Sequence, residues 1–143
     1  MKEKFILLVD DNPDDVKLTL KALEKNKIAN RVDVAWDGVE ALDYLFGRGK
    51  FADRDTSLMP QLVLLDINMP RMNGLEVLRT IRSDERTKLL PVVILTTSNE
   101  DKDRLQSYAT GVNSYIRKPV DFTQFTDAIQ QLGLYWLVLN EVP

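Results

Sequence analysis

Short apolar runs recur along this chain, and segments with helical periodicity separate them. Five such runs are present, at residues 5–9, 32–36, 62–65, 92–95 and 114–116. Because most of them are continuous, without alternating polar residues, they predict strands that are covered on both faces, as in a parallel sheet. Strands that alternate with helices through right-handed crossovers predict a doubly wound α/β fold, with a five-stranded parallel sheet in (βα)5 order.

Apolar residues at helical spacing mark three helix faces between the predicted strands, and each face can cover the sheet. A fourth helix is expected at about 100–109, where Gly111 can stop it, and a fifth is expected to begin near Asp121, which can cap it. The three helix faces are formed by Val16, Leu20 and Leu23, by Ala41, Leu42 and Leu45, and by Leu75, Leu78 and Ile81.

Ligands of such folds bind beyond the carboxyl ends of the strands, so functional residues are expected there.

The chain has 143 residues, which predicts a single domain over residues 1–143, and it contains neither cysteine nor histidine. Disulfides, thiolate nucleophiles, zinc–thiolate sites and imidazole catalysis are therefore excluded. The net charge of −3 and the lack of a long Lys/Arg cluster argue against a nucleic-acid partner. The apolar run near the start is too short for a signal segment or a membrane span, so we expect a cytoplasmic protein without a membrane partner.

Three aspartates lie where predicted strands end. Asp10 and Asp11 end the first strand, and Asp66 directly follows the apolar sequence LVLL. Capping of the next helix would by itself explain Asp10 and Asp11 about as well as a binding site would. Packing offers no such reason for a charge at residue 66. Carboxylates a few ångströms apart recruit a cation, and an all-oxygen ligand set suits Mg²⁺, which would also allow a carboxylate to attack a phosphoryl group.

Two further polar residues follow predicted strands. Thr96 directly follows the fourth run and would bring a hydroxyl to the same edge, although a β-branched residue is also ordinary in a strand. Lys118 follows the fifth run and precedes Pro119, which restricts the backbone before it. A lysine there can meet a phosphate as a point charge, and the proline can fix the turn, for which a cis peptide bond is one solution. Each signal is weak alone, but together they favour a phosphoryl site.

Several motifs at these positions resemble the receiver domain of bacterial two-component response regulators. They are Val9-Asp10-Asp11, the LDINMP sequence at 65–70, Asn73-Gly74, Leu95-Thr96 and Lys118-Pro119. The resemblance covers about residues 4–132. It implies a flavodoxin-like receiver fold with strand order 2-1-3-4-5. It also implies a protein that accepts a phosphoryl group from the histidine of a sensor kinase and catalyses its own transfer and dephosphorylation, rather than a classical enzyme.

The resemblance further implies a phosphoacceptor and a metal site. Asp66 would be the phosphoacceptor. Asp11 and Asp66 would bind Mg²⁺ directly, Asp10 would act through a metal-bound water molecule, and the backbone carbonyl of Asn68 would be a further ligand.

The remaining implied roles belong to the phosphoryl-responsive residues and the turns. Lys118 would pair with the phosphoryl oxygens, and Thr96 would turn inward to hydrogen-bond them. Tyr115 would then pack into the space that Thr96 vacates, which would switch partner binding. Gly74 and Pro119 would shape the turns beside the site.

Two other functions stay open at this point. An aspartate-nucleophile phosphohydrolase, similar to haloacid dehalogenases, also uses aspartate and Mg²⁺ on a parallel sheet. Those enzymes place a D-x-D pair after the first strand and add a cap domain, whereas Asn68 stands two residues after Asp66 here. A degenerate receiver that serves only as an interaction scaffold would fail to bind Mg²⁺.

Two segments lie outside the receiver motifs. Residues 47–60 are longer than the usual connection of about two to six residues and form either a tolerated surface insertion or a partner-docking loop. The apolar sequence at 134–139 predicts a C-terminal helical extension at about 133–140, which favours a homodimer. Both segments resemble those of small stand-alone response regulators paired with bacterial and cyanobacterial phytochromes, which implies a phytochrome-type sensor kinase.

Overall fold

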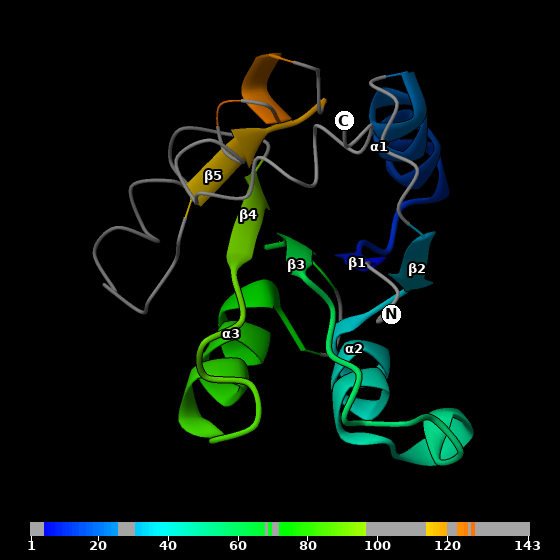
Figure 1. The fold of residues 1–143 in the computed structure, drawn as a ribbon. Coiled ribbons are helices and arrows are strands. Elements are labelled where there is room, and N and C mark those ends of the chain that lie inside the picture. Colours follow the sequence, from blue (N-terminus) through cyan, green and yellow to red (C-terminus); the bar gives the residue numbers. More distant parts are fainter. Residues whose placement is uncertain are drawn as a thin grey trace, which may run out of the picture.

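The computed structural model of the chain describes residues 5–25, 31–67, 69, 72–96, 114–119, 123–125 and 127. Its strands form one five-stranded parallel sheet in the order β2-β1-β3-β4-β5 (Figure 1). The predicted parallel sheet and the implied strand order are therefore confirmed. The strands are β1 (Phe5–Val9), β2 (Arg31–Ala35), β3 (Leu62–Asp66), β4 (Val92–Thr96) and β5 (Ser114–Arg117).

The ends of most strands differ from the predicted runs by one residue. β3, β4 and β5 extend one residue further, through Asp66, Thr96 and Arg117. β2 begins one residue earlier and ends before Trp36, which is exposed. The extension arises because backbone pairing between parallel strands continues past the last apolar side chain. Asp66 is consequently the last residue of β3, at the strand end where it was predicted.

Helices cover both faces of the sheet, as predicted for a doubly wound fold (Figure 1). α1 (Pro13–Lys25) packs on one face, whereas α2 (Gly38–Phe46) and α3 (Gly74–Ser83) pack on the other. The predicted helix at about 100–109 and the start of the helix near Asp121 lie outside the described residues. Residues 123–125 are helical, and Phe125 is buried on the same face as α1. None of the helices in the described part of the chain could span a membrane.

The central strands are buried on both faces, which explains their continuous apolar sequences. In β1, Leu7 and Val9 pack with α2 and α3, whereas Ile6 and Leu8 pack with α1. All residues of β1 and β3 are buried, including Asp66. Polar side chains on these strands are thus confined to the strand ends, where functional groups can reach solvent.

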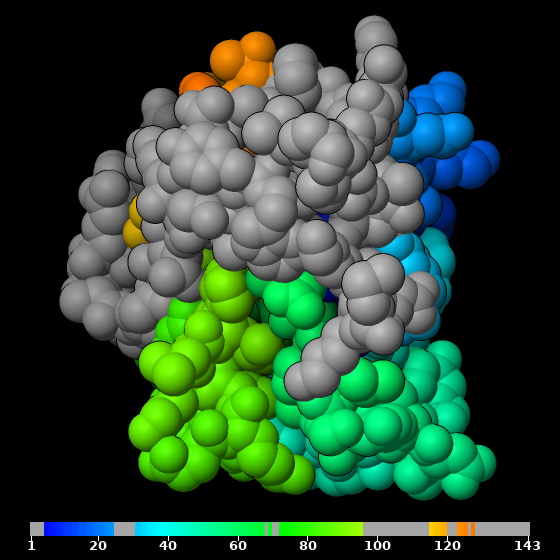
Figure 2. Space-filling view, viewed as in Figure 1, coloured from blue at the N-terminus to red at the C-terminus, as the bar shows by residue number. Residues whose placement is uncertain are grey.

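Residues 47–60 form an ordered segment on the outer surface, at the lower right of Figure 2. The segment contains a short 3₁₀ helix, η1 (Gly49–Phe51), and follows Gly47, which ends α2 with a positive φ of 67°. Arg54 donates hydrogen bonds to the carbonyl oxygens of Tyr44 and Leu58, each at 2.6 Å. Because this segment connects α2 to the start of β3, it lies at the amino end of the sheet, opposite the predicted site.

Tyr44 anchors this segment to the domain. Its ring lies 5.1 Å from the ring of Phe51, and the Arg54 guanidinium lies 4.3 Å above it. Its hydroxyl donates a hydrogen bond to Asp33. Burial, then this hydrogen bond and the charge of Asp33, raise the pKa of Tyr44 from 10.0 to about 12. The neutral phenol is therefore favoured in the folded state.

Gly74 begins α3 where the chain passes closest to the end of β3. Its N–H donates to the carbonyl oxygen of Ile67 at 3.0 Å. A Cβ at this position would lie 2.4 Å from the carbonyl oxygen of Asp66 and 2.8 Å from the Cα of Ile67. Both neighbours are backbone atoms, which side-chain rotation cannot move away. A larger residue would thus displace either α3 or the backbone of Asp66.

We expect Gly74→Ala to lower the free energy of unfolding by about 1–3 kcal/mol, because the added methyl group overpacks a backbone contact. Urea denaturation measures this loss. Ser83→Ala, at the exposed end of the same helix, should change stability by less than about 0.5 kcal/mol. Equal stability of Gly74→Ala and wild type would contradict the close approach.

The raised pKa of Tyr44 predicts a pH dependence of stability. A raised folded-state pKa stabilises the fold below the unfolded value of 10.0, and this contribution is lost as the pH rises through about 12. We expect the free energy of unfolding to fall over this range by about 2 kcal/mol more in wild type than in Tyr44→Phe. Urea denaturation at several pH values measures both slopes, and parallel slopes would contradict the assignment.

Candidate functional site

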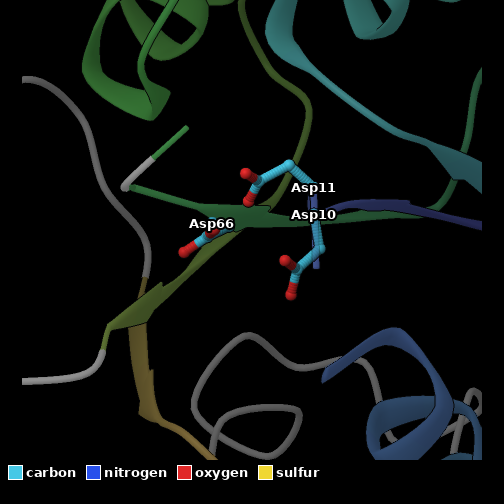
Figure 3. Close-up of side chains that lie close together, drawn as sticks. All are labelled: Asp10, Asp11 and Asp66. Carbon is cyan, nitrogen blue, oxygen red and sulfur yellow. The ribbon is translucent and has the colours of Figure 1, made fainter. Parts of the chain in front are cut away.

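Three aspartates converge at the carboxyl end of the sheet. Asp10 and Asp11 follow β1, and Asp66 ends the neighbouring strand β3. Figure 3 shows the three side chains gathered where these strands end. One carboxylate oxygen from each lies within 4.8 Å of the others. The predicted convergence of these carboxylates is therefore confirmed.

The three carboxylates differ in their contact with solvent. Asp10 is completely buried and Asp66 is 3% exposed, whereas Asp11 is exposed. Asp10 Oδ1 accepts a hydrogen bond from the backbone N–H of Asn12 at 3.1 Å. Two of these charges are therefore held where water solvates them poorly, which is costly unless a cation compensates them.

Asn12 caps α1 in place of the aspartates. Its side-chain oxygen accepts hydrogen bonds from the backbone N–H groups of Asp14 and Asp15, at 2.9 and 3.1 Å. This arrangement satisfies donors that the first turn of a helix leaves without intrahelical partners. Helix capping therefore does not account for Asp10 and Asp11, and their side chains are left for the site.

Lys118 brings the compensating positive charge. It follows β5, precedes a cis peptide bond to Pro119, and its side chain is 8% exposed. Its Nζ lies 2.8 Å from Asp10 Oδ2, 3.0 Å from Asp15 Oδ2 and 3.4 Å from Asp66 Oδ1. Burial lowers the pKa of Lys118, but its contacts with Asp10 and Asp15 and the charge of Asp66 outweigh this effect and raise the pKa. The ammonium form is thus retained.

Asp15 is a member of the site that the sequence patterns did not reveal. It lies in the first turn of α1, where acidic residues are common because they interact favourably with the helix dipole. Its contact with Lys118 joins residues 103 positions apart in the chain. No local pattern distinguishes Asp15 from its neighbour Asp14, so only the position of the first turn of α1 next to Lys118 reveals this role.

An open cleft of about 510 Å³ leads from solvent to Asp66. Its volume is sufficient for a small anion together with its bound water. Asp10 lies beneath the cleft and is not part of its lining. The lining consists of Asp11, Asn12, Pro13, Asp14, Asp15, Asp66 and Lys118.

The structure describes the remaining predicted residues to different extents. The backbone of Thr96 ends β4, one position after Leu95, which pairs with Asp66. Tyr115 lies in β5, pairs with Ile94 and is partly buried on the α2 and α3 face. Burial raises the pKa of Tyr115. The side chain of Thr96 and all of Asn68 lie outside the described part of the structure, as does the predicted extension at 133–140.

The residues present fit a hard divalent cation. Among the described residues, the site gathers four carboxylates, from Asp10, Asp11, Asp15 and Asp66, with one ammonium, that of Lys118. Positive charge is therefore in deficit, and all the acidic donors are oxygen atoms, which Mg²⁺ and similar ions prefer. The site has the donor chemistry that a divalent cation requires.

Comparison with known proteins identifies the family. The profile of the response regulator receiver domain matches residues 6–130, so the chain belongs to this family, whose members accept phosphoryl groups from histidine kinases. Members are signalling receivers rather than classical enzymes, which removes support from the phosphohydrolase alternative. The predicted receiver family is confirmed.

Several relatives are phytochrome response regulators. The structure of the bacteriophytochrome response regulator AtBRR is 49% identical, covers 95% of this chain and 96% of its own, and superposes with a TM-score of 0.90. The phosphorylated cyanobacterial phytochrome response regulator RcpA is 36% identical, with 99% and 97% coverage and a TM-score of 0.74. Response regulator Rcp1 from Synechocystis sp. is 34% identical over 98% of this chain and 93% of its own length. One Rcp1 structure contains Mn²⁺ and has a TM-score of 0.73.

The charge deficit predicts that a divalent cation stabilises the fold. We expect millimolar Mg²⁺ to raise the free energy of unfolding of the wild type by about 1 kcal/mol, because the ion binds only the folded site. Asp11→Asn should remove most of this gain. Asp84→Asn, which removes a partly exposed carboxylate at the end of α3, away from the cleft, should retain it. Urea denaturation with Mg²⁺ or with a chelator measures the gain, and an equal gain in Asp11→Asn would contradict the site.

Proposed function

We propose that this protein is a response regulator in which Asp66 accepts a phosphoryl group from the histidine of a sensor kinase. The observation that carries the proposal is the position of Asp66. Its carboxylate lines the cleft, lies 3.4 Å from Lys118 Nζ, and has Asp10 and Asp11 beside it. A nucleophile, a positively charged partner for phosphoryl oxygens and a set of cation ligands thus meet at one opening.

In the proposed reaction, a carboxylate oxygen of Asp66 attacks the phosphorus atom of the phosphohistidine. The new O–P bond forms as the N–P bond breaks, and the electron pair stays on the imidazole nitrogen. Lys118 would donate hydrogen bonds to the transferred oxygens from its position beside Asp66. Later attack by water on the acyl phosphate would release inorganic phosphate and restore the carboxylate, so the protein would catalyse its own dephosphorylation.

Mg²⁺ would complete this site. Asp11 and Asp66 would hold the ion directly, Asp10 would act through a water molecule, and the backbone carbonyl of Asn68 would be a further ligand. The oxygen donors at Asp10, Asp11 and Asp66 and the Mn²⁺-bound Rcp1 structure support this assignment. When bound, the ion neutralises negative charge on the phosphoryl group, which lets a carboxylate approach it.

The switch would operate through Thr96 and Tyr115. The Thr96 hydroxyl would hydrogen-bond the phosphoryl group, and Tyr115 would move from its partly buried position into the space released. The strand register supports this role, because Thr96 follows the residue that pairs with Asp66. Shifting a population from 1:99 to 99:1 requires about 5.5 kcal/mol, which two or three charge-assisted hydrogen bonds can supply.

The partners follow from the relatives and the sequence. The phytochrome response regulators among the relatives support a phytochrome-type sensor kinase as the phosphoryl donor. We further propose a single cytoplasmic receiver domain that dimerises through the apolar extension at 133–140, without nucleic-acid or membrane partners.

Gly74 and Pro119 would shape the turns beside Asp66 and Lys118, as their close backbone approach and cis peptide bond suggest.

Acetyl phosphate tests the phosphoacceptor directly. In the presence of Mg²⁺ we expect the intact wild-type protein to gain one phosphoryl mass, and Asp66→Asn to gain none, because it lacks the attacking carboxylate. Intact-protein mass spectrometry measures both. Asp14→Asn, which changes a neighbouring carboxylate of the cleft lining, should still be labelled. Undiminished labelling of Asp66→Asn would refute the assignment.

A further inference from the structure

Asp15 competes for the lysine on which the proposed phosphoryl state depends. Its Oδ2 accepts a hydrogen bond from Lys118 Nζ at 3.0 Å, whereas Asp66 Oδ1 lies 3.4 Å from the same nitrogen. The ammonium therefore lies closer to the Asp15 carboxylate at the rim of the cleft than to the Asp66 carboxylate. A residue of α1 thus contacts the reactive end of the sheet.

The ammonium of Lys118 is already engaged by several carboxylates. A lysine ammonium carries three N–H bonds, and three carboxylates, from Asp10, Asp15 and Asp66, surround Lys118 Nζ in the described structure. The contact with Asp15 is a hydrogen bond, so a phosphoryl oxygen that accepts this donor displaces the Asp15 carboxylate. Formation of the phosphorylated state therefore includes an exchange of partners at Lys118.

The side-chain exposures indicate which carboxylate leaves. The side chain of Asp10 is fully buried and that of Asp66 is 4% exposed, whereas that of Asp15 is 31% exposed. A carboxylate that is released into water keeps its solvation, but a buried one is left without compensation. Asp15 is therefore the partner whose release costs least.

We propose that Asp15 is a positioning residue that holds Lys118 in the unphosphorylated state and competes with the phosphoryl group for it. This inference rests on the proposed phosphorylation of Asp66. Loss of the Asp15 carboxylate frees one donor of Lys118 before the phosphoryl group arrives. The phosphorylated state then binds the lysine more tightly, because no existing hydrogen bond has to be broken first.

Asp14 is a matched control for this idea. It lies beside Asp15 in the first turn of α1, lines the same cleft and carries the same charge. Among the described residues, the carboxylates within ion-pair distance of Lys118 Nζ are those of Asp10, Asp15 and Asp66, so Asp14 is not one of them. Asp14→Asn and Asp15→Asn therefore change the net charge of the cleft equally, but only the second changes a partner of Lys118.

Calorimetric titration with beryllofluoride, an anionic mimic of the phosphoryl group, in the presence of Mg²⁺ tests the inference. We expect Asp15→Asn to bind the mimic about tenfold more tightly than wild type, because one competing charge-assisted hydrogen bond is lost. Asp14→Asn should remain within about twofold of wild type, because a solvated charge at the rim interacts weakly. Equal tightening in both variants would overturn the inference in favour of general charge repulsion.

A second comparison tests whether Asp15 acts through Lys118. In a Lys118→Gln background, Asp15→Asn should change the affinity for beryllofluoride by no more than about twofold, since the coupling between the two residues has been removed. An undiminished effect would overturn the inference. Should Lys118→Gln not fold, the ammonium ¹H–¹⁵N resonance of Lys118 decides instead. It should shift in Asp15→Asn and not in Asp14→Asn, and equal behaviour of the two would refute the contact.

The outcomes separate this inference from the function on which it rests. If wild type fails to bind the mimic, the proposed phosphoryl site fails and the inference fails with it. If wild type binds and Asp15→Asn binds equally well, only the role of Asp15 fails.

Discussion

The structure depends on the compensation of several carboxylates by one buried ammonium. Asp10 has no exposure to solvent, and its nearest positive charge is Lys118 Nζ at 2.8 Å. Because removal of one member of a buried ion pair leaves an uncompensated charge, this contact links β1 to the segment after β5. The same ammonium reaches Asp15 and Asp66, so the cleft, the start of α1 and the proposed phosphoacceptor share one counter-charge.

The sheet explains why these groups meet at one edge. β1 and β3 are neighbours, and their parallel register brings the ends of both strands side by side. Their residues are covered by helices on both faces, so a charged side chain is tolerated only where the strand ends. Gly74 then lets α3 begin directly against the backbone of Asp66. Fold stability and the geometry of the site are therefore supported by the same contacts.

The charge balance also explains how such a site can act as a switch. Among the described residues, the cleft has more carboxylates than cations, and a divalent ion or a rearranged lysine would change that balance. A two-state response requires groups that gain partners in one state only. Lys118, shared by three carboxylates, would be such a group in the proposed switch, because the phosphoryl group would replace one of its partners. The ordered segment at 47–60 lies at the opposite end of the sheet and is separate from this chemistry.

Local patterns of hydrophobicity are enough to predict the parallel sheet, its helical layers and the aspartates at the strand ends. Three strands extend one residue beyond their predicted apolar runs, through Asp66, Thr96 and Arg117, since backbone pairing continues beyond the apolar side chains. Strand order and the individual roles came from family resemblance. The contact of Lys118 with Asp15, 103 residues away, rather than with Asp14 arises only in the folded chain. It depends on where the first turn of α1 lies relative to Lys118, a long-range arrangement that no local pattern encodes.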